Sequence, residues 1–344
     1  MELLEMLIKC LGVQRPDDAC PALLPPSGEV PLDPNATSIW PWGLPIILTC
    51  LSITAVAMMI RIFTRAYITK MFAVEDVVMI LATVTYFGFV AITLESISLG
   101  FGKHQWNVTV GEVMRALRRA YAVEIVYCIA MYLAKIGVIL QIKATFDSRS
   151  RDFMFWSCWA CIVSFTCVYT ASLVTWIFPC NPIRKKWDPF IPGTCHNTVA
   201  EPSFMSGIMN LVTDIALLLL PIYSVSRLQM NLRKKIAVCG IFGSAALACI
   251  GSAFRLHYTL KHLASDDHTY WLAIVAICAI IEISALLLCG AFPTFPHFSR
   301  YLGYGFKLKS IGYTVTNSGK DSREAPSESI NLTTRTKAHS MDPV

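Results

Sequence analysis

Charged residues are scarce in this chain. Asp, Glu, Lys and Arg make up 15% of its 344 residues, whereas hydrophobic residues make up 55%. An ordinary soluble domain carries about 25% charged residues. A soluble fold of this size has too little polar surface to cover so much apolar mass, and the same composition excludes disorder over most of the chain. The composition therefore indicates a multi-pass integral membrane protein.

Motifs for soluble enzymes, for light sensing and for nucleic-acid binding are also missing. Gly100-Phe-Gly102-Lys103 lacks the spacing of a phosphate loop. The last apolar run has no Lys that could form a Schiff base with retinal. The charged run from His257 to His268 is better explained as a solvated loop than as a metal site. The small net charge of +6 suits an anionic membrane face rather than nucleic acid. We therefore expect membrane lipid as a partner, with no metal, cofactor or nucleic acid.

Seven apolar runs are long enough to cross a bilayer as helices. A spanning helix needs about 20 mostly apolar residues, and these runs lack the period of two that marks barrel strands. An all-α membrane protein is therefore predicted, with a seven-transmembrane-helix bundle over 42–300, an extracellular segment over 1–41 and a disordered cytoplasmic tail over 301–344. The predicted spans are 42–63, 75–99, 121–142, 153–178, 207–226, 236–258 and 271–292.

Basic residues in the loops set the predicted orientation. Lys and Arg are in excess in the loops after the first, third and fifth spans and in the C-terminal tail, although Arg115, Arg118 and Arg119 lie on the other side. The excess predicts an extracellular N-terminus and a cytoplasmic C-terminus, in the plasma membrane or an endomembrane. Sequons at Asn35 and Asn107 both fall on the predicted outside, where glycosylation can occur.

The position of each cysteine decides its interpretation. Most of the 13 lie within predicted spans, where a free thiol packs as a small hydrophobe. The four on the predicted oxidising side indicate two disulfides; they are Cys10, Cys20, Cys180 and Cys195. A Cys180–Cys195 bridge would close the loop between the fourth and fifth spans and contribute about 3 kcal/mol through chain entropy. Pairing of Cys10 with Cys20, or of the N-terminal segment with the loop, stays open.

Polar side chains inside the predicted spans are the candidate functional residues, because a charge in lipid is costly. Asn210 and Asp214 are four residues apart, so they share one helix face. Two interpretations are open: a water-filled cavity that opens outward, or interhelical pairs, such as Arg255 with Asp214 or Glu282, that hold the bundle together. The predicted ligand-binding residues are Glu95, Glu124, Asn210, Asp214, Arg255 and Glu282.

Lys135 has a separate interpretation, because it lies nearer the predicted cytoplasmic end of the third span. Its long side chain is expected to snorkel toward the inner surface or to pair with Glu75 and Asp76 at the start of the second span. A structural role is therefore expected for Lys135.

Taken in order along the chain, these features resemble the fungal rhodopsin-like integral membrane family, which is named for its seven spans and not for retinal. The resemblance runs from about Trp42 to Arg300. Two positions depart from it: Val77 replaces a common Trp, and Gln141-Ile-Lys143 replaces a Tyr/Arg-type sequence at the inner end of the third span. The residues that carry it are Arg61, Arg65, Glu75-Asp76, Gly100-Phe-Gly102-Lys103-His104, Lys135, Cys180-Asn-Pro182, Trp187, Gly193-Thr-Cys195, Asn210, Asp214, Leu220-Pro221 and Arg255.

The resemblance implies two functions. Some members look like G-protein-coupled receptors, which implies sensing of a small lipophilic ligand from the outer face, with segments 143–151 and 227–235 contacting a cytoplasmic signalling partner. Other members are encoded in fungal secondary-metabolite and mycotoxin clusters, including the satratoxin cluster. They imply tailoring, cyclisation or transport of an intermediate, in which buried carboxylates could act as acids. A transporter is disfavoured by the missing internal repeat and the odd number of spans.

Overall fold

The computed structural model of the chain is dominated by α-helices. Asn35, Cys10 and most of the predicted disordered tail lie outside the described residues. Cys20 takes part in a disulfide. The structure describes residues 20–23, 25, 29–33, 36–146, 153–188, 191–195, 200–226 and 232–303.

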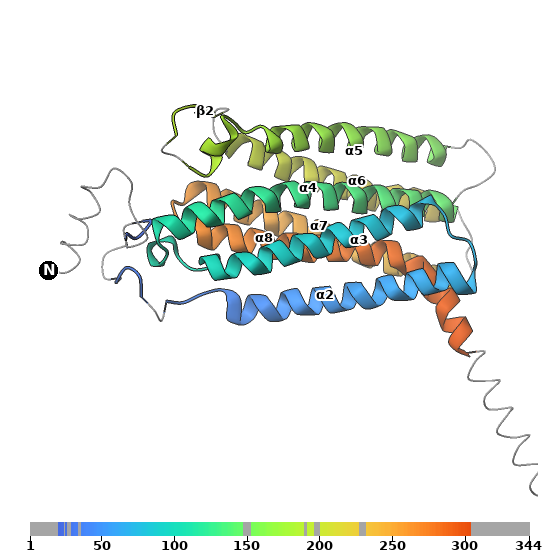
Figure 1. Ribbon diagram of the computed structural model, residues 1–344. Helices are drawn as coiled ribbons and strands as arrows, with labels where there is room; N and C mark the ends of the chain where they lie inside the picture. Colours follow the sequence, from blue (N-terminus) through green and yellow to red (C-terminus); the bar gives the residue numbers. More distant parts are fainter. Residues whose placement is uncertain are drawn as a thin grey trace, which may run out of the picture. The chain divides into compact units, whose positions relative to one another are not determined.

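Each predicted span corresponds to one long helix in the described part of the chain. The helices are α2 (Trp40–Phe63), α3 (Val74–Ser96), α4 (Val110–Phe146), α5 (Phe153–Ile177), α6 (Ala200–Ser226), α7 (Leu232–Ala264) and α8 (His268–Ala291). They run alongside one another in alternating directions (Figure 1). The strands β1 (Cys180–Asn181) and β2 (Thr194–Cys195) lie at the end of the bundle where α5 ends and α6 begins. We call this the disulfide end.

The helix α4 begins well before the predicted third span. Thr109 caps it, because the Thr109 hydroxyl accepts a hydrogen bond from the Glu112 N–H (3.3 Å) and the Glu112 carboxylate accepts one from the Thr109 N–H (3.0 Å). Ala116 is buried, whereas Arg119 lies on the exposed face. The arginines that marked this segment as a loop are thus the polar face of an amphipathic helix extension.

Six of the helices are long and apolar enough to cross a membrane. Over the described residues, α7 is the exception. Arg255, Lys261 and His262 lie along its second half. It packs between α6 and α8 as an element of the same bundle.

The core of the bundle lies around α8, which contacts α2, α3, α4 and α7. The close approach of α4 and α8 to α3 depends on two glycines that lie against the fully buried Met79 of α3. A Cβ atom at Gly137 of α4 would lie 2.6 Å from Met79 Sδ, and one at Gly290 of α8 would lie 3.0 Å from the same sulfur. Met79 is therefore held between two helix backbones and has no room to yield.

A second set of contacts ties the helices at the end opposite the disulfide. Arg61 of α2 is 1% exposed; it donates to Asp76 of α3 (2.6 Å), to Gln141 of α4 (2.5 Å) and to the Gly290 carbonyl of α8. Arg65 lies 3.5 Å from Asp76 as well. Because these arginines satisfy the acidic pair, the expectation that Lys135 pairs with it is wrong.

The packing of Met79 predicts a position-specific cost for added bulk. Gly137→Val should lower the free energy of unfolding by about 1–3 kcal/mol, the usual cost of overpacking a core. Thermal unfolding of the protein in phospholipid nanodiscs measures this effect. Gly88→Val in α3 is the matched control, because no described atom lies within 4 Å of a Cβ there. Equal losses in both variants would contradict the packing argument.

Candidate functional site

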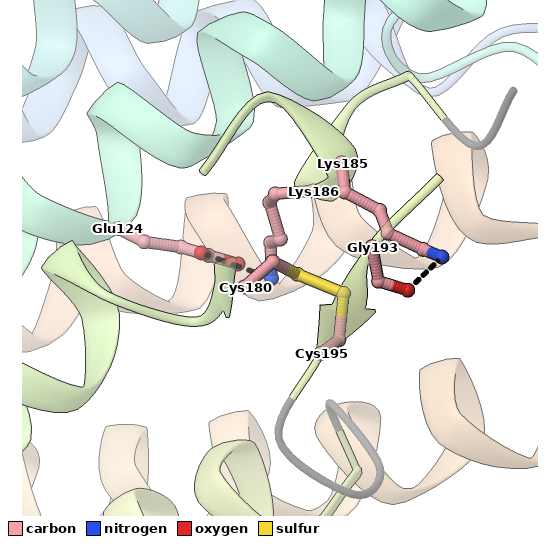
Figure 2. Close-up of a disulfide and its surroundings, with 6 residues drawn as sticks. All are labelled: Glu124, Cys180, Lys185, Lys186, Gly193 and Cys195. Carbon is pink, nitrogen blue, oxygen red and sulfur yellow. Dashed lines mark hydrogen bonds and ion pairs between the residues drawn. A yellow bond between two sulfur atoms is a disulfide. The ribbon is translucent and has the colours of Figure 1, made fainter. Parts of the chain in front are cut away.

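A disulfide-closed loop covers one end of the bundle. Cys180 and Cys195 are bonded, as predicted, and they pair across the antiparallel strands β1 and β2. Gly193 is required beside β2, because a Cβ there would lie 2.5 Å from the Asn181 carbonyl oxygen. The Lys185 ammonium donates to the Gly193 carbonyl at 2.5 Å (Figure 2). The hairpin thus holds the 3₁₀ helix η4 (Ile183–Lys186) in a fixed place.

The closed loop places Lys186 against the bundle. Lys186 points toward Glu124 of α4, and its Nζ lies 3.7 Å from Glu124 Oε2 (Figure 2). The same ammonium lies 5.3 Å from the centroid of the Trp176 ring in α5. The next residue, Trp187, packs its ring on Tyr121 of α4. The disulfide, although far from the core, therefore determines which cation faces the interior of the helix bundle.

Beneath this loop lies a cavity of about 450 Å³. Residues of α3, α4, α5, α6, α7 and α8 line it together with Lys186 of η4. Most of the wall is apolar, including Phe89, Val123, Trp176, Leu272 and Ala276. A few polar side chains interrupt that wall, chiefly Glu124, Tyr127, Lys186, Arg255, Thr259 and His262. An apolar cavity with a few placed polar groups is the usual form of a small-molecule site.

Arg255 forms the polar floor of the cavity. Its Nε donates to Glu282 Oε2 at 3.0 Å, and its guanidinium carbon lies 5.1 Å from the centroid of the Tyr127 ring. The side chain is buried, and its Nη2 has no hydrogen-bond partner among the described residues. The Nε donor of the guanidinium is thus used by the protein, whereas its Nη2 donor is not used by any described residue.

A second ion pair lies deeper in the bundle, where Lys135 is fully buried. The Lys135 Nζ lies 2.8 Å from Asp214 Oδ1. It also donates to the Thr213 hydroxyl at 2.7 Å and to Asn210 Oδ1 at 3.1 Å. The Tyr169 hydroxyl of α5 donates to the same Asn210 oxygen at 2.7 Å. Lys135 therefore reaches across to α6 instead of snorkelling to the inner surface.

Asn210 and Ser252 join the two ion pairs into one network. The Asn210 amide donates to Asp214 Oδ2 (3.2 Å) and also contacts Glu282. The Ser252 hydroxyl, on α7, contacts both Asp214 and Glu282. Lys135 and Arg255 thus balance Asp214 and Glu282. We call these four residues, together with Tyr169, Asn210, Thr213 and Ser252, the buried network, and it spans helices α4 to α8.

The structure separates the six predicted site residues into three groups. Glu124 and Arg255 line the cavity, and Arg255 also belongs to the buried network through its ion pair with Glu282, one of the two interhelical pairs that the sequence suggests. Asn210, Asp214 and Glu282 lie in the buried network. Glu95 lies apart from both, because it is exposed and pairs with Arg119 at 3.0 Å.

The sequence patterns do not single out four residues of the site: Tyr127 and Lys186, which line the cavity, and Thr213 and Ser252, which belong to the buried network. His262, which they assign to a solvated run, also lines the cavity. A signal for Ser252 exists, because it lies three residues before Arg255 and so shares its helix face. No sequence signal shows that η4 turns Lys186 inward.

The loop before α4 is fastened to the start of α8. The His104 ring is stacked between the rings of Trp106 (4.4 Å) and Tyr270 (4.3 Å), and its Nδ1 lies 2.6 Å from Asp267 Oδ2. Asp267 is thus buried rather than solvated as predicted. Nearby, the predicted glycosylation residue Asn107 accepts a hydrogen bond from the Asp33 N–H through its Oδ1 (3.1 Å).

Comparison with known proteins identifies the family. The sequence matches the fungal rhodopsin domain over residues 60–300. The chain belongs to the fungal rhodopsin family. The same helices that carry the buried network and the cavity lie inside the matched region. No solved structure matches the chain.

Three curated relatives are similar to this family member. Fugralins biosynthesis cluster protein 2 of Gibberella zeae is 30% identical over 279 residues, which cover 79% of this chain and 68% of that protein. A SAT4 family membrane protein of Emericella nidulans is 29% identical over 62% of this chain and 54% of its own length. Receptor GIN3 of Arthrobotrys oligospora is 23% identical over 49% of this chain and 40% of its own length. The match therefore spans only part of each relative.

The buried network predicts strong coupling between Lys135 and Asp214. Lys135→Met should lower the free energy of unfolding by about 3–5 kcal/mol, because it leaves a buried carboxylate without its cation. Lys135→Met combined with Asp214→Asn should cost clearly less than the sum of the two single changes. Titration with SDS in mixed micelles measures each value. Glu95→Gln, in an exposed pair, is the control and should change stability by less than about 0.5 kcal/mol. Additive effects of the two buried changes would contradict the coupling.

Proposed function

We propose that this protein is a seven-span, receptor-like membrane protein that senses a small lipophilic ligand from the outer face. The cavity at the disulfide end supports this function, because its volume of about 450 Å³ falls in the range of small-molecule sites. The observation that carries the proposal is that Arg255 both lines this cavity and belongs to the buried network. A ligand that moves Arg255 also moves Glu282, and with it a network that spans five helices.

The contacts of α8 support transmission to the opposite end. Glu282 of α8 belongs to the buried network, and the Gly290 carbonyl of the same helix accepts a hydrogen bond from Arg61. These two positions are eight residues apart, or about 12 Å along a helix. A rigid shift of α8 would therefore alter both sets of contacts, as helix movements do in other switching proteins. The proposed signalling partner binds the cytoplasmic loops at this opposite end.

Our proposed topology has residues 1–41 outside, a bundle over 42–300 and a cytoplasmic tail over 301–344. Two features of the disulfide end favour placing it outside the cell. A disulfide persists on the oxidising side of a membrane, and the Asn107 sequon lies at the same end. The polar residues of α7 are compatible with a spanning helix, because Ser252 and Arg255 face the bundle interior.

The proposed topology predicts that tags on the two ends of the chain lie in different compartments. An N-terminal tag should bind antibody on intact cells or sealed vesicles of the outside-out orientation, and a C-terminal tag only after permeabilisation. Asn107→Gln should remove a glycan that is seen as a mobility shift on deglycosylation. Both tags in one compartment would contradict the odd number of spans.

A cavity-filling substitution tests the sensing function. In a strain that lacks the native gene, Ala276→Phe should abolish the transcriptional response to lipophilic extracts of the growth medium, because the phenyl ring occupies the cavity. A fluorescent fusion verifies that the variant reaches the membrane. Leu219→Phe on α6 is the matched control, because Leu219 is 57% exposed on the bundle surface. A normal response in the Ala276 variant would contradict ligand sensing in this cavity.

A second candidate function is a membrane component of a secondary-metabolite pathway that tailors, cyclises or transports an intermediate. One relative carries the name of a biosynthesis cluster protein, which favours this alternative. The cavity also presents Glu124, a carboxylate that could act as an acid on a bound intermediate. Metabolite profiles of the same strains distinguish the two functions. Loss of a product in the Ala276 variant, with an intact transcriptional response, would favour the pathway role.

A further inference from the structure

Three buried polar atoms around the cavity lack a hydrogen-bond partner among the described residues. They are Arg255 Nη2, Glu124 Oε2 and His262 Nδ1. The nearest cation to the Glu124 oxygen is Lys186 Nζ, which at 3.7 Å is beyond hydrogen-bond distance. Buried polar atoms normally have hydrogen-bond partners, so three residues with unused hydrogen-bonding atoms around one cavity indicate where polar groups of a ligand belong.

The charges around the cavity are already balanced. Arg255 is paired with Glu282, Lys186 faces Glu124, and beneath them Lys135 is paired with Asp214. His262 lies beyond the predicted span 236–258. Burial, together with nearby His268 and Lys186, lowers the pKa of its ring to about 4. The imidazole is therefore neutral at pH 7 and can exchange hydrogen bonds without adding a charge.

We propose that the cavity selects a neutral, oxygenated molecule with an apolar body. A carbonyl oxygen of this ligand accepts a hydrogen bond from Arg255 Nη2, and a hydroxyl group bonds to Glu124 or His262. Its apolar body lies against Phe89, Trp176 and Leu272. This inference rests on the proposed ligand-binding function and adds the chemical class of the ligand.

Two other ligand classes fit less well. A carboxylate would add a buried negative charge beside Glu282 and Glu124, with no free cation among the described lining residues to balance it. A plain hydrocarbon would fill the apolar part but would leave the three polar atoms unpaired. The preference for a neutral ligand with both an acceptor and a donor therefore follows from charge balance and hydrogen bonding together.

Three probes of equal chain length test this preference on the full-length protein in phosphatidylcholine nanodiscs. Methyl 12-hydroxydodecanoate carries a neutral acceptor and a donor, methyl dodecanoate lacks the donor, and the 12-hydroxydodecanoate anion carries a charge. Tryptophan fluorescence, corrected with empty nanodiscs, gives each Kd. The neutral hydroxy ester should bind about tenfold or more tightly than either relative, as expected for one hydrogen bond to a charged group.

Variants locate the binding. Ala276→Phe should abolish binding of the hydroxy ester, whereas Leu219→Phe should leave its Kd unchanged. Arg255→Lys keeps a cation beside Glu282 but lacks the Nη2 donor, so it should weaken ester binding about tenfold. If the Arg255 variant fails to fold, the Ala276 variant and the three probes still decide the question.

Four outcomes would overturn the inference: tightest binding of the carboxylate, equal binding of all three probes, binding that Ala276→Phe leaves intact, or no binding of any probe. A preference for the carboxylate that Ala276→Phe abolishes would refute the ligand class alone, and the proposed sensing function would stand. A cellular response that Ala276→Phe leaves unchanged would refute the sensing function itself.

Discussion

The architecture depends on a balanced set of charges in an apolar interior. Lys135, Asp214, Arg255 and Glu282 are all buried, and no bulk water at that depth can solvate an unpaired ion. Each cation can be neutralised only by a carboxylate from another helix, so α4 must meet α6, and α7 must meet α8, in one register. Hydrophobic residues alone do not select such a register, because lipid is as apolar as the helix surfaces. The network supplies that selection.

The network also explains why the two ends of the bundle are connected. The helix α8 contributes Glu282 to the network, contacts Arg61 at the opposite end through the Gly290 carbonyl, and packs Gly290 against Met79 of α3. A change in the position of α8 therefore alters both the buried network and the contacts of Arg61 at the opposite end. Close packing makes such a helix move as a unit rather than bend gradually, because cores are tight and resist compression.

Much of the fold, but only part of the pairing, could be predicted from the sequence: Arg255 with Glu282 is among the expected pairs, whereas Lys135 with Asp214 is not. Helix positions follow from apolar runs, which need only composition and length. The Cys180–Cys195 bond follows from two cysteines that border one loop. Partners across helices depend on rotation and depth, and these are set by packing that a single sequence does not display. The sequence predicts that Lys135 snorkels or pairs with Glu75 and Asp76, whereas Lys135 pairs with Asp214. It also predicts Glu95 as a ligand-binding residue, whereas Glu95 pairs with Arg119 at the surface.

A structural role and the proposed binding role are compatible in one side chain, that of Arg255. Arg255 lines the cavity, uses its Nε to bind Glu282 and close the network, and has a buried Nη2 with no hydrogen-bond partner among the described residues. A buried ion pair is weak evidence for stability as such, since well-packed apolar residues often replace it without loss. Apolar residues could not replace the Nη2 donor of Arg255, which the ion pair with Glu282 holds in position. The ion pair therefore fixes the orientation of the Nη2 donor that we propose a cavity ligand uses.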